Sequence, residues 1–125
     1  MAGKIAYIED EEFFASVISK KLVDHGFEVD TFADGESGLA AIKGNGYDLV
    51  LLDLILPKLD GLEVLKALKE DPHAKNIPVV VLSNQSGEDN QKKAMDLGAK
   101  AYYVKVNAMP SEIVTMVAGF LKEKH

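Results

Sequence analysis

The sequence predicts an α/β protein built on one parallel sheet, and two observations support that prediction. Short apolar and β-branched runs alternate with amphipathic stretches five times along the 125 residues. The links between them are short, and such repetition implies right-handed crossovers and a sheet covered on both faces. The third and fourth apolar runs are the most uniformly apolar, as expected for strands near the sheet centre.

Five segments are predicted as strands from their apolar and β-branched content. They are Lys4–Ile8, Glu28–Phe32, Asp48–Leu52, Pro78–Leu82 and Ala101–Val104. We expect them to pair in the flavodoxin-like order 2-1-3-4-5, as the middle layer of a three-layer sandwich with five helices. No linker, repeat or low-complexity stretch interrupts the chain, so residues 1–125 are expected to form one domain.

The first two helices are predicted from apolar spacing and from their end signals. Phe14, Ile18 and Leu22 recur every four residues, which places them on one helical face. The first helix should end near Gly26, because glycine adopts the left-handed conformation that commonly follows a helix. Asp34 is the predicted N-cap of the second helix, since its side chain can accept a hydrogen bond from a free backbone N–H.

The remaining three helices are bounded by glycine and proline. The third begins near Gly61 and ends before Pro72, because the residue preceding a proline disfavours the helical conformation. The fourth is expected from about residue 87 to residue 97, ending at Gly98. The fifth begins at Pro110, since proline suits the first turn of a helix, and it continues with an apolar stripe.

Composition excludes several classes of function. The chain has no cysteine, so disulfides, thiolate catalysis and cysteine metal sites are excluded. A net charge of −6 argues against nucleic-acid binding by this domain, because phosphate contacts need clustered lysine and arginine. The apolar runs are too short to span a bilayer, and no signal peptide is recognisable. We therefore expect a cytoplasmic protein with no membrane partner.

Acidic residues follow two of the predicted strands. Asp53 comes directly after the apolar run Leu49–Leu52, and Glu9 and Asp10 follow the first strand. The carboxyl ends of parallel strands meet at one edge of a sheet, where such folds place their active sites. Three carboxylates would repel one another there, and a hard divalent cation such as Mg2+ is the usual remedy. The pattern predicts an aspartate beside a metal, and an aspartate can act as a nucleophile.

These residues, together with two more at strand ends, resemble the receiver domains of bacterial two-component response regulators. The chain is similar to the single receiver domains of the chemotaxis and sporulation type over essentially its whole length. The acidic pair Glu9-Asp10 and the segment from Asp53 to Gly61 match the family's motifs. Ser83 stands where the family has a hydroxyl residue, and Lys105 where it has a lysine.

The resemblance implies a phosphorylation-dependent switch that catalyses only its own phosphorylation and dephosphorylation. Asp53 would accept a phosphoryl group from a histidine kinase or histidine phosphotransfer protein. Phosphorylation would then change a surface that binds a downstream target or an attached output domain. The implied Mg2+ ligands are Glu9, Asp10, Asp53 and the backbone carbonyl of Ile55. The implied phosphoryl-contact and switch residues are Ser83, Asn84, Lys105 and Tyr102.

Four positions give this chain expectations of its own. Val106 replaces the family's usual cis-proline, so we expect a trans Lys105–Val106 bond, because a non-proline cis bond costs about 3–4 kcal/mol. Asn84 replaces a small residue and would either narrow access to Asp53 or offer the phosphoryl group a donor. Ile55 and Gln85 would flank the water that hydrolyses the phosphoryl bond, and an apolar Ile55 predicts slow hydrolysis.

Three other functions are alternatives to the switch. A phosphatase working through an aspartyl phosphate needs a second aspartate two residues after the first, where this chain has Ile55. A flavin-phosphate binder would need amides and hydroxyls after the first strand, whereas the acids at 9–12 would repel a phosphate. A degenerate receiver that only binds proteins stays open because of Val106.

Overall fold

The computed structural model describes residues 3–84, 88–105 and 109–123. The strands are β1 (Lys4–Ile8), β2 (Glu28–Phe32), β3 (Leu49–Leu52), β4 (Val79–Ser83) and β5 (Ala101–Val104). The helices are α1 (Glu12–Asp24), α2 (Gly35–Gly44), α3 (Gly61–Glu70), α4 (Glu88–Asp96) and α5 (Pro110–Glu123). Within these described ranges, no helix has the length and apolar content that crossing a bilayer requires.

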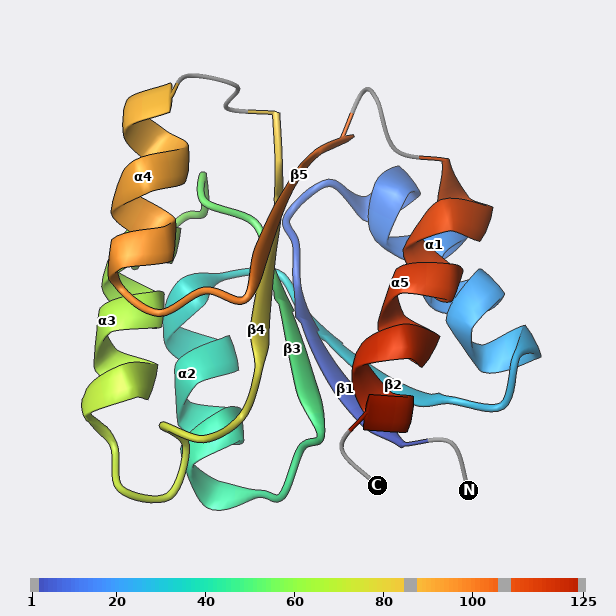
Figure 1. The fold of residues 1–125 in the computed structure, drawn as a ribbon, viewed down its shortest axis with the longest axis horizontal. Coiled ribbons are helices and arrows are strands. Elements are labelled where there is room, and N and C mark those ends of the chain that lie inside the picture. Colours follow the sequence, from blue (N-terminus) through green and yellow to red (C-terminus); the bar gives the residue numbers. More distant parts are fainter. Residues whose placement is uncertain (1–2, 85–87, 106–108, 124–125) are drawn as a thin grey trace.

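The five strands form one parallel sheet with the order β2-β1-β3-β4-β5, which confirms the predicted order. Helices α1 and α5 cover one face of the sheet, and α2, α3 and α4 cover the other (Figure 1). The molecule is therefore the predicted three-layer sandwich. Every residue of β3 and β4 is buried, which agrees with their apolar sequences and their inner positions.

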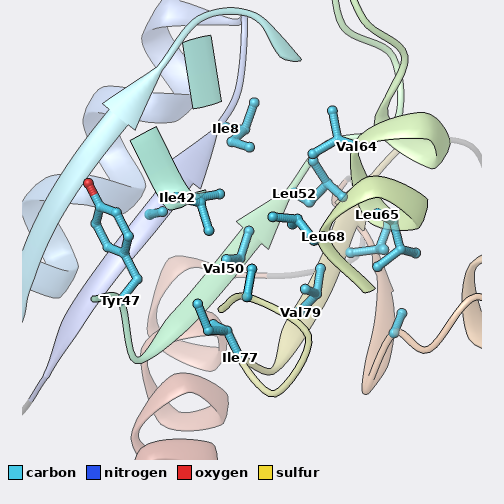
Figure 2. Packing of buried hydrophobic residues seen from close by; sticks show 14 of the residues in the cluster. Ile8, Ile42, Tyr47, Val50, Leu52, Val64, Leu65, Leu68, Ile77 and Val79 are labelled. Carbon is cyan, nitrogen blue, oxygen red and sulfur yellow. The ribbon is translucent and has the colours of Figure 1, made fainter. Parts of the chain in front are cut away.

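The pleat of the sheet divides the apolar residues between two cores, because neighbouring side chains of a strand point to opposite faces. On the side of α2, α3 and α4, Val50 and Leu52 of β3 pack with a cluster that includes Leu65 (Figure 2). On the other side, Leu49 and Leu51 of the same strand join a cluster formed with α1 and α5. Both cores hold the sheet rigid beneath its carboxyl edge.

The predicted end signals are present with small shifts of boundary. Gly26 and Gly98 have φ of 94° and 107°, the left-handed backbone that glycine adopts without strain. The Oδ1 atom of Asp34 accepts a hydrogen bond from the Ser37 N–H at 2.7 Å, as expected of an N-cap. Two strands begin one residue later than predicted, and β4 continues through Ser83, whose backbone pairs with Val104.

Candidate functional site

Four strand ends bring one group of polar side chains together at the carboxyl edge of the sheet. Glu9 follows β1, Asp53 follows β3, Ser83 ends β4 and Lys105 follows β5. These are the buried polar or charged residues of the described chain, each at most 4% exposed. Burying charge costs free energy unless the charges are paired, so their position beside one another explains how the fold tolerates them.

Lys105 is the centre of this group. Its Nζ atom lies 2.7 Å from Glu9 Oε2, 3.1 Å from Asp53 Oδ2 and 3.3 Å from Glu11 Oε2. The same ammonium lies 5.0 Å from the centre of the Phe14 ring, within cation–π range. One cation thus joins carboxylates that follow β1 and β3, and it does so from the end of β5.

The backbone around Asp53 is held by short hydrogen bonds and by a close approach of α3. The Asp53 N–H donates to the Ile8 carbonyl at 3.0 Å, and Asp53 Oδ1 accepts from the Ile55 N–H at 3.3 Å. The Gly61 N–H donates to the Leu54 carbonyl at 2.9 Å. A Cβ atom at Gly61 would overlap the carbonyl oxygen of Asp53, so only glycine lets α3 begin so close to this aspartate.

Three carboxylates fit the ligand set of a hard divalent cation. Oxygen atoms of Glu9, Asp10 and Asp53 all lie within 4.8 Å of one another. Asp10 is exposed to solvent while the other two are buried, so the group is open on one side. Oxygen donors at this separation suit Mg2+ or Mn2+, which prefer carboxylates, carbonyls and water. Coordination by the Ile55 carbonyl stays a prediction.

The packing of these charges shifts two pKa values. Burial raises the pKa of Glu9 to about 7; the hydrogen bond from Lys105 opposes this rise and the charge of Asp53 adds to it. Burial by itself lowers the pKa of Lys105, but its hydrogen bonds to Glu9 and Asp53 outweigh that effect and raise it. Lys105 is therefore charged at neutral pH, while Glu9 sits near its midpoint of titration.

A small cavity of about 190 Å³ lies above Asp53. Its lining consists of acidic groups, one cation, one hydroxyl, one amide and one apolar side chain: Asp10, Glu11, Asp53, Ile55, Ser83, Asn84 and Lys105. Ile55 is 58% exposed and Asn84 is also exposed, so both lie at the rim rather than on the floor. A group the size of a phosphoryl entering this cavity would meet Asp53, Ser83 and Lys105 together.

The two tyrosines of β5 lie on opposite faces, as their neighbouring positions require. Tyr102 packs against the core on the side of α2, α3 and α4, where burial raises the pKa of its hydroxyl and an interaction with the Ser83 side chain opposes that rise. Tyr103 is 37% exposed. The side chains of the predicted switch pair, Ser83 and Tyr102, are thus near enough to interact.

Two residues named from the sequence lie outside the described residues. They are Gln85, expected to flank the hydrolytic water, and Val106, expected to follow a trans peptide bond. Both expectations stay predictions.

Two residues that touch the site were not singled out from the sequence. The hydroxyl of Tyr7 donates to Glu9 Oε1 at 3.2 Å, and Glu11 supplies the third carboxylate to Lys105. The sequence did give a reason to consider Tyr7. Its hydroxyl stands among the aliphatic residues of the strand, two positions before Glu9, where it would lie on the same side of the strand as that acid. For Glu11 there was none beyond its charge, since its contact joins residues 94 positions apart.

Known proteins share both the sequence pattern and the fold. The transcriptional regulatory protein QseB of Haemophilus influenzae is 34% identical over 122 residues, which is 98% of this chain and 54% of QseB. The phosphorylated cyanobacterial phytochrome response regulator RcpA superposes with a TM-score of 0.83 at 38% identity, covering 95% of this chain and 91% of that one. The Mn2+-bound response regulator Rcp1 superposes with a TM-score of 0.81 at 31% identity, covering 94% and 90%.

The match to a protein family covers nearly the whole chain, although the curated relatives are longer. The chain spans about half the length of these relatives, 54% of QseB and 53% of the phosphate regulon regulator PhoB of Rhizobium meliloti. Residues 5–118 match the family described as the response regulator receiver domain. The chain belongs to this family of receiver domains.

Proposed function

We propose that this chain, as one receiver domain over residues 1–125, is a switch phosphorylated on Asp53. The observation that carries the proposal is the contact of one buried aspartate with one buried lysine, 3.1 Å apart, beside two further carboxylates. An aspartate paired only for stability need not lie at the floor of a cavity that also holds the Ser83 hydroxyl and the carboxylates of Asp10 and Glu11. The phosphorylated state of RcpA and the Mn2+ bound by Rcp1 support the same reading.

In the proposed reaction an oxygen of Asp53 attacks the phosphorus of a phosphorylated donor. The bond from phosphorus to the donor breaks as the new bond forms, and the donor leaves with the electron pair of the broken bond. Glu9, Asp10 and Asp53 would hold Mg2+, which supplies positive charge to the transferring oxygens. The Lys105 ammonium and the Ile55 N–H hold Asp53 in place, so little reorganisation is needed at the moment of attack.

The new phosphoryl group changes the partners of the neighbouring side chains. Lys105 exchanges its contact with Asp53 for the phosphoryl oxygens, which carry more negative charge than a carboxylate. The hydroxyl of Ser83 turns to donate to a phosphoryl oxygen, which ends its interaction with Tyr102. Tyr102 then repacks, and the surface around α4, β5 and α5 is altered for a partner.

The donor and the recipient of this signal follow from the same chemistry. We propose that the protein acts in the cytoplasm, with a histidine kinase or histidine phosphotransfer protein as the donor of the phosphoryl group. The recipient is a downstream target protein or an output domain attached to the same chain. The lengths of QseB and PhoB, which are transcriptional regulators twice as long, make an attached domain the form to test first.

Labelling by acetyl phosphate tests the proposed acceptor. The protein is incubated with acetyl phosphate and Mg2+, and bound phosphate is measured by intact-mass spectrometry. We expect one phosphoryl group labile to acid and to base on the wild type and none on Asp53→Asn. Asp60→Asn is the matched control, because Asp60 lies in the same loop but is exposed and makes no capping hydrogen bond with its side chain.

Each outcome decides between the competing functions. Undiminished labelling of Asp53→Asn would show that another residue accepts the phosphoryl group. A wild type that takes up no phosphoryl group from acetyl phosphate, yet binds Mg2+, would favour the degenerate receiver that acts only by binding proteins.

A further inference from the structure

Tyr7 places a hydroxyl group beneath the acidic cluster, inside a core that is otherwise apolar on this strand. The residue is 0% exposed and packs in the cluster formed with α1 and α5. Tyr7 and Glu9 are two positions apart at the end of β1, so their side chains lie on the same side of the chain. The Tyr7 hydroxyl donates to Glu9 Oε1 at 3.2 Å.

Among the described residues, the buried hydroxyl donates to Glu9. A phenol hydroxyl removed from water costs free energy unless it finds a partner, and here the partner is Glu9 Oε1. The other oxygen, Oε2, accepts from Lys105 Nζ at 2.7 Å and from the Glu11 N–H at 3.2 Å. Both oxygens of this glutamate are therefore committed, each to different donors.

Glutamate needs such support more than a shorter acid would. Its carboxylate is carried on three rotatable bonds, and freezing them costs side-chain entropy. Tyrosine has few rotatable bonds and this ring is packed on all sides, so its hydroxyl is a fixed point. A hydrogen bond from a fixed donor holds the carboxylate in the orientation that faces Asp10 and Asp53.

We propose that Tyr7 is a positioning residue that holds Glu9 in place for a divalent cation. The inference rests on the proposed function, because it deepens the same metal site. Tyr7 does not touch the cation; it fixes one oxygen of a ligand so that the cluster of Glu9, Asp10 and Asp53 is organised before the cation arrives. Partners behind a metal ligand are expected to change metal affinity about 10–100-fold when removed.

The chain contains a matched control for this hydrogen bond. Tyr47 is 5% exposed, and its hydroxyl donates to Asp30 Oδ2 at 2.8 Å. Asp30 lies in β2 and belongs neither to the acidic cluster nor to the cavity above Asp53. Tyr7→Phe and Tyr47→Phe therefore each remove one hydroxyl that donates to a carboxylate, and only the first removes it from a proposed ligand.

Calorimetric titration with Mg2+ tests the proposal on the wild type and both variants. We expect Tyr7→Phe to bind Mg2+ about 10-fold more weakly than the wild type, and Tyr47→Phe to stay within about 2-fold. Equal affinity of Tyr7→Phe and wild type would overturn the proposal. An equal loss in both variants would also overturn it, because the effect would then be a general consequence of losing a buried hydroxyl.

Carbon-13 NMR of tyrosines labelled at Cζ gives a second test that needs no stable Tyr7 variant. The Cζ chemical shift reports the hydrogen bond of the hydroxyl, so adding Mg2+ should move the Tyr7 resonance of the wild type. The Mg2+ concentration at the midpoint of this change should equal the midpoint found by calorimetry. The Tyr47 resonance should not move. A stationary Tyr7 resonance during saturation with Mg2+ overturns the proposal, whereas a wild type that binds no Mg2+ overturns the metal site itself.

Discussion

The two ends of the sheet differ in how far their charged side chains are exposed to solvent. At the amino end, the Lys4 ammonium lies 4.0 Å from Glu28 and 4.8 Å from the centre of the Tyr47 ring, with its side chain 33% exposed. At the carboxyl end, the Lys105 side chain is 3% exposed and lies within 3.3 Å of three carboxylates. A lysine thus forms a partly exposed ion pair with one carboxylate at the amino end, and a buried group with three carboxylates at the carboxyl end.

The difference separates what stabilises the fold from what performs its function. An exposed pair such as Lys4–Glu28 is screened by water and contributes at most about 1 kcal/mol. The buried group has an excess of negative charge, which costs stability until a cation neutralises it. The protein keeps this cost at the edge where both cores hold the strands rigid.

The largest expected effect comes from removing the central cation. Lys105→Met leaves Glu9 and Asp53 buried without their partner, and we expect the free energy of unfolding at pH 8 to fall by about 3–5 kcal/mol. Lys4→Met removes the exposed lysine and should cost less than about 1 kcal/mol. Urea denaturation with a metal chelator present measures both. Similar losses would show that the two ends do not differ.

A second expected effect is a pH dependence that belongs to Glu9. Its pKa is about 7 in the folded protein, above the value near 4.3 of an unfolded glutamate. Between these values the folded state holds a proton that the unfolded state has lost, so this contribution to stability is complete below pH 4 and disappears as the pH rises through 7. Glu9→Gln should therefore flatten the fall in unfolding free energy across this window, by up to roughly 3 kcal/mol.

The measurement is urea denaturation at several pH values from 4.5 to 8, in chelator. Glu28→Gln, which alters an exposed acid at the amino end, should keep the wild-type profile. A Glu9→Gln profile parallel to that of the wild type would contradict the raised pKa.

A third comparison uses two glycines. A Cβ at Gly61 would overlap the carbonyl oxygen of Asp53, whereas a Cβ at Gly44 would meet nothing within 4 Å. Gly61→Ala should therefore lower the unfolding free energy by about 1–3 kcal/mol through overpacking. Gly44→Ala should leave it unchanged or raise it by up to about 1 kcal/mol, because alanine favours the helix. Thermal unfolding of both variants decides, and equal effects would refute the close approach of α3.

The fold could be predicted from the sequence because the signals for strands and helix ends are local and repeated along the chain. The third and fourth apolar runs, now β3 and most of β4, predicted inner strands, and Gly26, Asp34 and Gly98 predicted helix ends from their own backbone chemistry. Asp53 and Glu9 were reached by a rule of topology, since the carboxyl ends of parallel strands share one edge, whereas Lys105 was reached through the resemblance to receiver domains.

What escaped prediction depends on geometry between side chains or on strain. The contact of Glu11 with Lys105 joins distant positions, and no pattern of residue types specifies it. Lys58 adopts φ of 68°, and the N–H of the next residue donates to the Pro57 carbonyl at 2.8 Å, a tight turn around a non-glycine residue. Lysine carries no local signal for that backbone, so only the packed loop before α3 reveals it.

The smallest expected effect concerns how long a phosphoryl group would last on Asp53. Ile55 lines the cavity above Asp53 and is 58% exposed, so it stands at the rim where water must enter. An isoleucine there cannot hydrogen-bond the water, whereas an asparagine can hold it near the phosphorus.

We expect Ile55→Asn to speed the loss of phosphate by up to about tenfold, which is about 1.4 kcal/mol of barrier, and Gln85→Ala to change it less. Val23→Asn is the matched control, because Val23 is 54% exposed near the end of α1, away from the cavity. Decay of phosphorylated protein is followed after removal of the donor at fixed Mg2+. Equal or slower decay in Ile55→Asn would show that this side chain does not shield the bond, and that the rim of the cavity is no more special than the opposite end of the sheet.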